Sequence, residues 1–207
     1  MRVPVQRRSI GKKSEIINTA YTLFSKNNFD DVSIRMISKE ANVSIGAIYS
    51  YFADKQDVFI EVAKQYSKDL FAFLYTSIEH DISKSATIEE ALYKLIIKEK
   101  EIISLNFNLH IELVRLSMID SRIREHHVQQ EASSAQKIGT LFNKHFKIEI
   151  QDPEVAIFII HKTIEEIIQY LLIFNVDIPE KRVFREMSLM IASYLEYKKR
   201  TLPIKSI

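Results

Sequence analysis

Glycine and proline are so scarce in this sequence that they restrict it to a small group of folds. Only three glycines and four prolines occur among 207 residues. These two residue types supply most tight turns and interrupt helices, so a chain with few of them favours long helices joined by short turns. A β-sandwich or a disordered chain would contain many more of both. The composition therefore predicts an all-α fold.

The remaining composition is that of an ordinary globular protein. Hydrophobic residues make up 46% of the chain and charged residues 27%, and the length allows one large helical domain or a small domain joined to a larger one. The absence of cysteine excludes a disulfide framework, a thiol nucleophile and a cysteine-based zinc site. Residues 1–14 are polar and basic and lack the apolar core of a secretory signal. We therefore expect a cytoplasmic protein.

The most apolar segment, residues 155–174, is about long enough to span a membrane. However, five polar or charged side chains interrupt it, and each would be costly in lipid. These are His161, Lys162, Glu165, Glu166 and Gln169. We expect a buried helix here, and no membrane partner.

Apolar spacing and capping residues predict about nine helices, no strand and no internal repeat. Ile16, Ala20 and Phe24 recur every four residues, which predicts an amphipathic helix over residues 12–27. Ser33, Ser44, Asp54, Thr87 and Asp152 are the kinds of residue that cap later helices. The further predicted helices are 34–41, 45–51, 55–80, 87–105, 106–119, 121–146, 153–174 and 180–200.

Residues 33–57, SIRMISKEANVSIGAIYSYFADKQD, contain the parts of a helix-turn-helix. A short helix leads through a tight turn at Asn42 and Val43 to a second short helix. The outer face of that second helix must fit the major groove of DNA, which requires small, polar or aromatic side chains. Ile48 and Phe52, spaced by four residues, are left to pack inward. The outward residues are Ser44, Gly46, Ala47, Tyr49, Ser50 and Tyr51.

The order NVSIGAIYSYFADKQDVF, preceded by IINTAYTLFSKNNFDDVSIRMISKEA, resembles the N-terminal domain of the TetR/AcrR family of regulators. The resemblance covers residues 12–62, and beyond them only the layout of helices is similar. It implies a three-helix DNA-binding domain over residues 1–54 and a helical ligand-binding and dimerisation domain over residues 55–207. It also implies a homodimer that binds a roughly palindromic operator with its third helix in the major groove.

The resemblance implies DNA contacts at particular residues. The positions of Tyr49 and Lys55 usually contact phosphates in the family. The position of Ile45 often carries lysine, and isoleucine can contact only a thymine methyl, so the family's operators do not transfer to this chain. Arg35 and Lys39 are more typical of surface charges. The predicted DNA-binding residues are Ser33, Ser44, Ile45, Gly46, Ala47, Tyr49, Ser50, Tyr51 and Lys55.

A basic arm precedes this domain. Five cations come before the first acidic residue, Glu15. Such an arm suits contact with phosphates or the minor groove, and a solvated terminus is the equal alternative. The cations are Arg2, Arg7, Arg8, Lys12 and Lys13.

Two predicted helices near the C-terminus point to dimerisation. In residues 155–174 apolar side chains occupy more than one side of the helix, so the helix needs partners around most of its circumference. Members of the resembled family pair these two helices with those of a second copy, and a symmetric dimer suits a palindrome. A purely intramolecular core is the alternative. The predicted interface residues are Ile160, Ile164, Ile168, Leu171, Met187 and Ile191.

The middle of the chain is expected to bind a small, mainly apolar effector. Apolar residues stand there beside a few polar groups, as in small-molecule sites, although a plain core would contain the same apolar residues. Arg115 suits an anionic head group or a pair with Glu112. The segment HIELVRLSMIDSRIREHHVQQ is faintly similar to fatty-acyl-CoA-responsive members. The candidate ligand residues are Phe107, His110, Val114, Arg115, Phe142 and Tyr170.

Other classes of function receive less support. His126 and His127 are adjacent on a predicted helix and point about 100° apart, so we expect no metal site, and no cofactor motif is present. The motifs of common enzymes are also missing. A DNA-binding regulator controlled by a protein partner, and an activator in place of a repressor, both stay open. We expect ligand binding to shift the helix over residues 55–80 and thereby change the spacing of the two recognition helices.

Overall fold

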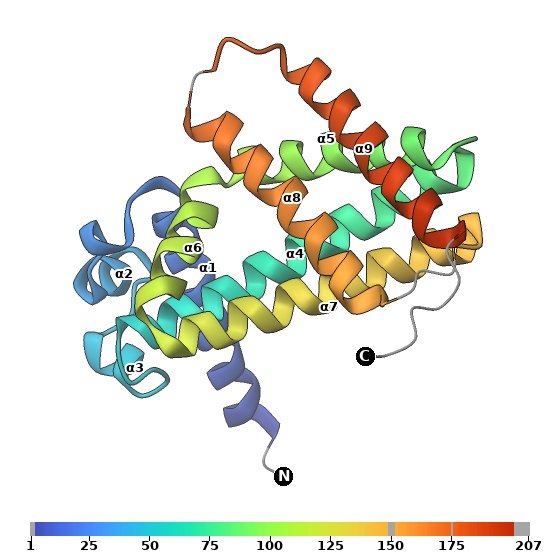
Figure 1. Ribbon diagram of the computed structural model, residues 1–207. Coiled ribbons are helices and arrows are strands. Elements are labelled where there is room, and N and C mark those ends of the chain that lie inside the picture. Colours follow the sequence, from blue (N-terminus) through green and yellow to red (C-terminus); the bar gives the residue numbers. More distant parts are fainter. Residues whose placement is uncertain (1–2, 149–151, 175, 201–207) are drawn as a thin grey trace. The chain divides into compact units, whose positions relative to one another are not determined.

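The computed structural model describes residues 3–148, 152–174 and 176–200, and within these ranges every regular element is a helix (Figure 1). The predicted all-α fold is confirmed. None of the helices in these ranges is by itself long and apolar enough to cross a membrane. The elements are α1 (Val3–Lys26), η1 (Phe29–Asp31), α2 (Ile34–Glu40), α3 (Ile45–Tyr49), α4 (Lys55–Lys84), α5 (Ile88–Leu105), α6 (Phe107–Ile119), α7 (Ser121–Phe146), α8 (Pro153–Ile173) and α9 (Glu180–Arg200).

The first helix is longer than the sequence pattern predicted. It begins at Val3, whereas the apolar repeat indicated a start near residue 12. Pro4 lies in its first turn, where a missing N–H breaks no helical hydrogen bond. Gly11 lies on its exposed side and costs the helix only about 1 kcal/mol relative to alanine. Neither residue therefore stops the helix.

The chain forms two compact units. The first contains Met1–Leu70 and Asn106–Gln130, and the second contains Phe71–Leu105 and Glu131–Ile207. Both α4 and α7 contribute residues to both units. The first unit thus contains α6 as well as the N-terminal helices, so its bounds differ from the predicted functional division at residue 54.

Aromatic packing forms the centre of the first unit. The rings of Phe24, Phe29 and Phe59 lie 5.2–5.6 Å apart between centroids, two pairs edge to face and one stacked. Such pairs stabilise a core beyond the burial of their area. Within this unit α1 packs against α2 and α6, and α2 packs against α3. The short helix-turn-helix segments are therefore fixed on a rigid base.

The second unit is built on α5. Both α8 and α9 pack against α5 and against each other. The chain runs in opposite directions along α8 and α9 (Figure 1). The interior is apolar, and its fully or almost fully buried side chains come from all three helices. They include Leu95, Ile96, Ile164, Ile168, Phe184 and Ile191.

Candidate functional site

The helix-turn-helix is shaped by local hydrogen bonds of its serines. Ser33 Oγ accepts the backbone N–H of Met36 at 3.2 Å, and Ser44 Oγ accepts that of Ala47 at 3.1 Å. These bonds cap α2 and α3 as the sequence predicted. The hydroxyl of Ser38 donates to the Val43 carbonyl at 2.7 Å and closes the turn between the two helices.

The turn itself depends on a left-handed residue. Asn42 has a φ of 50°, and asparagine adopts this conformation more readily than most residues do. The turn therefore aims α3 away from α2 at low conformational cost.

One face of α3 is buried and the other is open to solvent. Ile48 is fully buried, while Ile45 is 43% exposed and Tyr49 is 54% exposed. A Cβ atom added to Gly46 would meet no atom within 4 Å, so the fold itself does not require glycine there. Such an exposed face of apolar, aromatic and backbone groups is what a recognition helix presents to a groove.

The other predicted residues of α3 lie around that face. Ser50 is exposed, and its hydroxyl donates to the carbonyl of Ala47 at 2.7 Å. Ala47 and Tyr51 lie at the edges of that face. Most of the predicted DNA contacts thus lie on α3 and its caps, with Tyr51 just beyond it, Ser33 at the cap of α2 and Lys55 at the start of α4.

Lys55 is already engaged within the chain. Its Nζ donates to the carbonyl oxygens of Phe29 and Val32, both at 2.8 Å, and lies 4.1 Å from the centre of the Phe29 ring. Burial lowers the pKa of Lys55, although Asp30 and Asp31 oppose this. The sequence predicted a phosphate contact, whereas here the ammonium holds the turn before α2.

The N-terminal arm is only partly within the described residues. Arg2 lies outside them, and Arg7 and Arg8 have a described backbone in α1 but no described side chain. Lys13 pairs with Glu61 of α4 at 3.0 Å. The arm's proposed DNA contact stays a prediction.

A set of ion pairs ties α6 and the start of α7 to the helix-turn-helix, all within the first unit. Arg115 of α6 donates to Glu112 at 2.7 Å and to Asp30 of η1 at 3.0 Å. Arg122 of α7 donates to Asp57 at 2.7 Å and to Asp54 at 3.2 Å. Sequence reasoning had named the Arg115–Glu112 pair as one alternative and had missed the contacts to the first helices.

Most of the predicted ligand residues lie in this first unit. His110 is buried, with its Nδ1 3.2 Å from the Tyr66 hydroxyl, and Phe107 and Val114 are partly buried. Tyr170 lies on α8 and is 55% exposed, with its ring centroid 4.7 Å from that of Phe174 and the two rings tilted by 41°.

The cavity found in the described chain lies elsewhere, inside the second unit. Its volume is about 60 Å³, room for roughly four to six waters. Of the six predicted ligand residues, Phe142 alone lines it. The lining residues are Leu92, Leu95, Glu99, Ala135, Ile138, Gly139, Phe142, Ile148, Ile157, Ile160, His161, Ile164 and Leu195.

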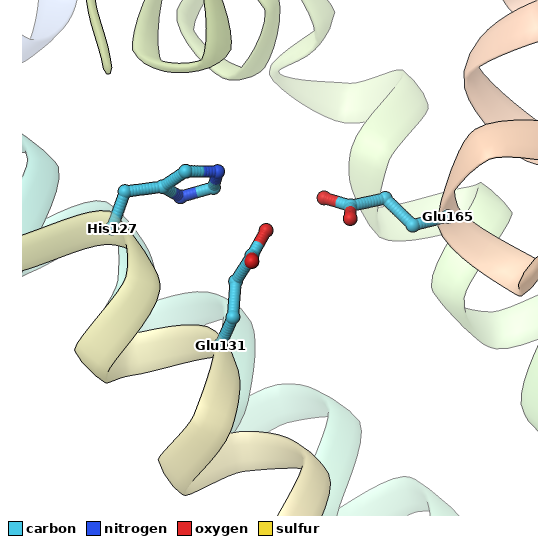
Figure 2. Close-up of side chains that lie close together, drawn as sticks. All are labelled: His127, Glu131 and Glu165. Carbon is cyan, nitrogen blue, oxygen red and sulfur yellow. The ribbon is translucent and has the colours of Figure 1, made fainter. Parts of the chain in front are cut away.

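Two further carboxylates lie near Glu99, which lines this cavity. Glu131 of α7 and Glu165 of α8 point toward each other (Figure 2). Lys162 Nζ donates to Glu131 at 2.8 Å and to Glu165 at 2.6 Å. Burial opposes the charge on Lys162, but these two hydrogen bonds prevail and raise its pKa. The lysine therefore serves as the cation of both carboxylates.

Glu99 of α5 forms no ion pair with the described residues, although the charge of Lys162 lowers its pKa slightly. Burial, reinforced by Glu165 and Glu131, raises the pKa of Glu99 to about 8. Sequence reasoning missed this residue, because a glutamate within the run KLIIKEKEII looks like one of several surface charges. The signal was its place one helical turn beyond the inward Leu95.

No metal was predicted from His126 and His127. Figure 2 also draws His127, which lies one turn before Glu131 on α7. Because Lys162 already pairs with both Glu131 and Glu165, those two carboxylates hold an ammonium group where a metal ion would have to bind.

The predicted dimer residues lie mainly in the core. Ile164, Ile168, Met187 and Ile191 are at most 3% exposed within a single chain, and Ile160 and Leu171 are partly buried. Side chains already buried cannot form the contacting surface of an interface. The apolar residues that α8 and α9 do expose are Val155, Phe158, Ile159, Tyr170, Ile173, Leu189, Met190 and Tyr197.

Comparisons with known proteins agree with this architecture. Residues 16–62 match the model of a family described as bacterial regulatory proteins, tetR family. The fatty acid metabolism regulator protein of Bacillus subtilis is 30% identical over 100 residues, which are 48% of this chain and 50% of that protein. The chain thus matches only half the length of this curated relative.

Solved structures extend the likeness to nearly the whole chain. A putative TetR-family regulator from Mesorhizobium loti has a TM-score of 0.70 at 17% identity, covering 92% of this chain and 97% of that one. The regulator FadR from Bacillus subtilis, solved in complex with stearoyl-CoA, has a TM-score of 0.62 at 22% identity, covering 87% and 97%. At these identities the likeness establishes the fold. The curated relative is described as a regulator, and the two solved structures are described as transcriptional regulators.

Proposed function

We propose that the chain is a transcriptional regulator of the TetR/AcrR family, which binds a two-fold symmetric operator as a homodimer and leaves it when a small, mainly apolar effector binds. The protein acts in this scheme as a cytoplasmic repressor. The observation that carries the proposal is the divided surface of α3, with Ile48 fully buried and Tyr49 54% exposed.

Gly46 adds to this argument. Glycine costs an exposed helix about 1 kcal/mol relative to alanine, and the space for a Cβ is free. The fold itself therefore supplies no reason for glycine at this position. Close approach of a DNA backbone to α3 supplies such a reason.

The exposed apolar side chains of α8 and α9 support the homodimer. Phe158 is 62% exposed and Tyr197 is 65% exposed. Monomeric proteins rarely expose large apolar patches of this kind to solvent. A second copy would cover this face through a two-fold axis. The same axis would place two recognition helices about 34–36 Å apart, one turn of DNA.

The cavity of the second unit is the proposed effector site. Its walls are almost entirely aliphatic and aromatic, with Glu99 and His161 as polar exceptions. Such a composition is typical of small-molecule sites. A similar structure was solved with stearoyl-CoA, but a cavity of about 60 Å³ favours a much smaller molecule here.

The signal would reach DNA through α4, α6 and α7. Both α4 and α7 belong in part to each unit, and α6 is joined to η1 through Arg115 and Asp30. A shift of α6 or α7 would therefore strain the ion pairs that hold the helix-turn-helix. Typical allosteric coupling amounts to about 1–3 kcal/mol.

The test starts from duplexes selected out of a random library by the full-length protein. We expect a two-fold symmetric consensus. Gly46→Ala should lower affinity for it by about tenfold or more while leaving stability equal or slightly higher. Gly11→Ala is the matched control, since it adds the same methyl at another open helical position. Selection of asymmetric sequences, or unchanged binding by Gly46→Ala, would overturn the proposal.

A further inference from the structure

The polar end of the cavity contains an acid without a partner. Within the described chain, the carboxyl of Glu99 accepts no hydrogen bond and forms no ion pair, although it lines the cavity. Glu99 is partly buried and its side chain lines the cavity, so the donor group of a ligand can reach a carboxyl that no protein donor occupies.

The surrounding charges are predominantly negative. From α7 comes Glu131, and from α8 come His161, Lys162 and Glu165. The single ammonium of Lys162 already binds the other two carboxylates at 2.8 and 2.6 Å. The α9 side adds the apolar Leu195.

The remaining nearby pair is self-contained. Glu180 of α9 pairs with Lys100 of α5 at 3.1 Å. Lys162 lowers the pKa of Glu99 through its charge, but its ammonium is held by Glu131 and Glu165 and forms no ion pair with Glu99 among the described residues.

We propose that this cavity binds a small hydrophobic amine, whose ammonium group pairs with Glu99 and whose apolar body lies against Leu92, Ile138 and Phe142. The inference rests on the proposed effector-responsive function and names the chemical class of the effector. An ammonium both fills the vacant hydrogen-bonding position and offsets the excess of carboxylates. A carboxylate or phosphate head would instead be placed beside three acids.

The size of the cavity limits the apolar body. The cavity volume of about 60 Å³ is well below the roughly 150 Å³ of a cavity that takes up benzene, so the apolar body is limited to a flexible chain of at most about six carbons. The ligand is therefore far smaller than an acyl-CoA.

Three probes of equal length separate the head groups: hexylamine, 1-hexanol and hexanoate. Each is titrated into the full-length protein by calorimetry, with thermal shift as a second readout. We expect hexylamine to bind at least about tenfold more tightly than the other two. Equal or tighter binding of hexanol or hexanoate would overturn the proposal, and so would the absence of hexylamine binding at about 10 mM.

Proton release identifies Glu99 as the partner. With a pKa of about 8, Glu99 is mostly protonated at pH 7, so pairing with an ammonium should release close to one proton. Calorimetry in buffers of different ionisation enthalpy measures this number. Affinity should also rise about tenfold from pH 7 to pH 9, where hexylamine itself stays charged.

Glu99→Gln should abolish the proton release and the preference for the amine, because the amide cannot ionise. Glu89→Gln is the matched control, an exposed glutamate on the same helix. Proton release that persists in Glu99→Gln would assign the amine to another group and overturn the inference.

DNA binding separates this inference from the function on which it rests. If hexylamine binds through Glu99 but leaves the operator complex intact, the chemical class stands and effector-controlled release falls. If an uncharged or anionic molecule binds in the cavity and releases DNA, the proposal of effector-controlled release is supported and the inference of an amine ligand is wrong.

Discussion

The buried carboxylate of Glu112 accepts a hydrogen bond from the backbone N–H of Phe29, 83 residues earlier in the chain, at 3.2 Å. The same carboxylate receives Arg115, which also reaches Asp30 at 3.0 Å. Glu112 thereby joins α6 to the turn in front of the helix-turn-helix. Phe29 is in turn part of the aromatic core that supports α2 and α3. A movement of α6 would therefore displace Phe29 and change the position of these two helices.

Glu112→Gln tests this link. The amide keeps one acceptor for Phe29 but loses the charge that holds Arg115, which weakens the link without removing the side chain. We expect effector affinity to stay unchanged, while the effector lowers operator affinity several-fold less than in the wild type. Operator binding is measured by fluorescence anisotropy across an effector titration.

Glu125→Gln, which removes an exposed carboxylate from α7, serves as the control and should behave as wild type. Full effector response in Glu112→Gln would show that the signal takes another route.

Lys55→Ala should reduce both stability and DNA binding. Two carbonyl oxygens, of Phe29 and Val32, lose their charged donor, and hydrogen bonds to charged groups contribute about 1.5–3 kcal/mol. Urea unfolding measures the stability, and a mobility shift across salt concentrations measures binding. A direct phosphate contact would lower the salt slope by about one unit, whereas a purely structural role would leave the slope unchanged.

Lys68→Ala removes an exposed lysine from the same helix and should change neither the stability nor the slope. Unaltered stability of Lys55→Ala would contradict the structural role.

The dimer face can be distinguished from the core by two substitutions on α8. Phe158 is 62% exposed, so Phe158→Glu should leave the folded monomer intact and break the dimer. Ile168 is fully buried, so Ile168→Glu should destabilise the fold itself by several kcal/mol. Analytical ultracentrifugation and circular dichroism report the two effects separately. A Phe158→Glu protein that still sediments as a dimer would place the interface elsewhere.

This contrast shows where sequence reasoning reaches its limit. Helical periodicity correctly grouped Ile164 and Ile168 on one face, because residues four apart share a side. Periodicity cannot say whether that face meets the same chain or a second copy. Only the exposed fractions of Phe158 and Ile159 in the structure identify them as candidates for contact with a second copy.

Local and long-range features differ in the same way. The caps at Ser33 and Ser44 could be predicted, since a serine hydroxyl acts within three residues of its own position. Arg115 pairs with Asp30 across 85 residues, and Glu99 meets carboxylates from two other helices. Those contacts depend on how helices pack, which no short pattern encodes.

The acid in the cavity should also shape how stability depends on pH. The pKa of Glu99 is raised from 4.5 to about 8 by burial and by Glu165 and Glu131. In the unfolded chain the carboxyl loses its proton near pH 4.5, while the folded chain retains it. The folded state binds more protons in this interval, so the free energy of unfolding falls as pH rises from about 4.5 to 8 and levels off above it.

Glu99→Gln removes this contribution, because glutamine does not titrate. We expect the variant to match the wild type near pH 4.5 and to exceed its stability by a few kcal/mol at pH 8, as measured by urea unfolding. A smaller slope should remain in the variant, since burial also raises the pKa of Glu165. Glu89→Gln should keep the wild-type slope, and identical slopes for wild type and Glu99→Gln would show that Glu99 is ionised in the folded protein.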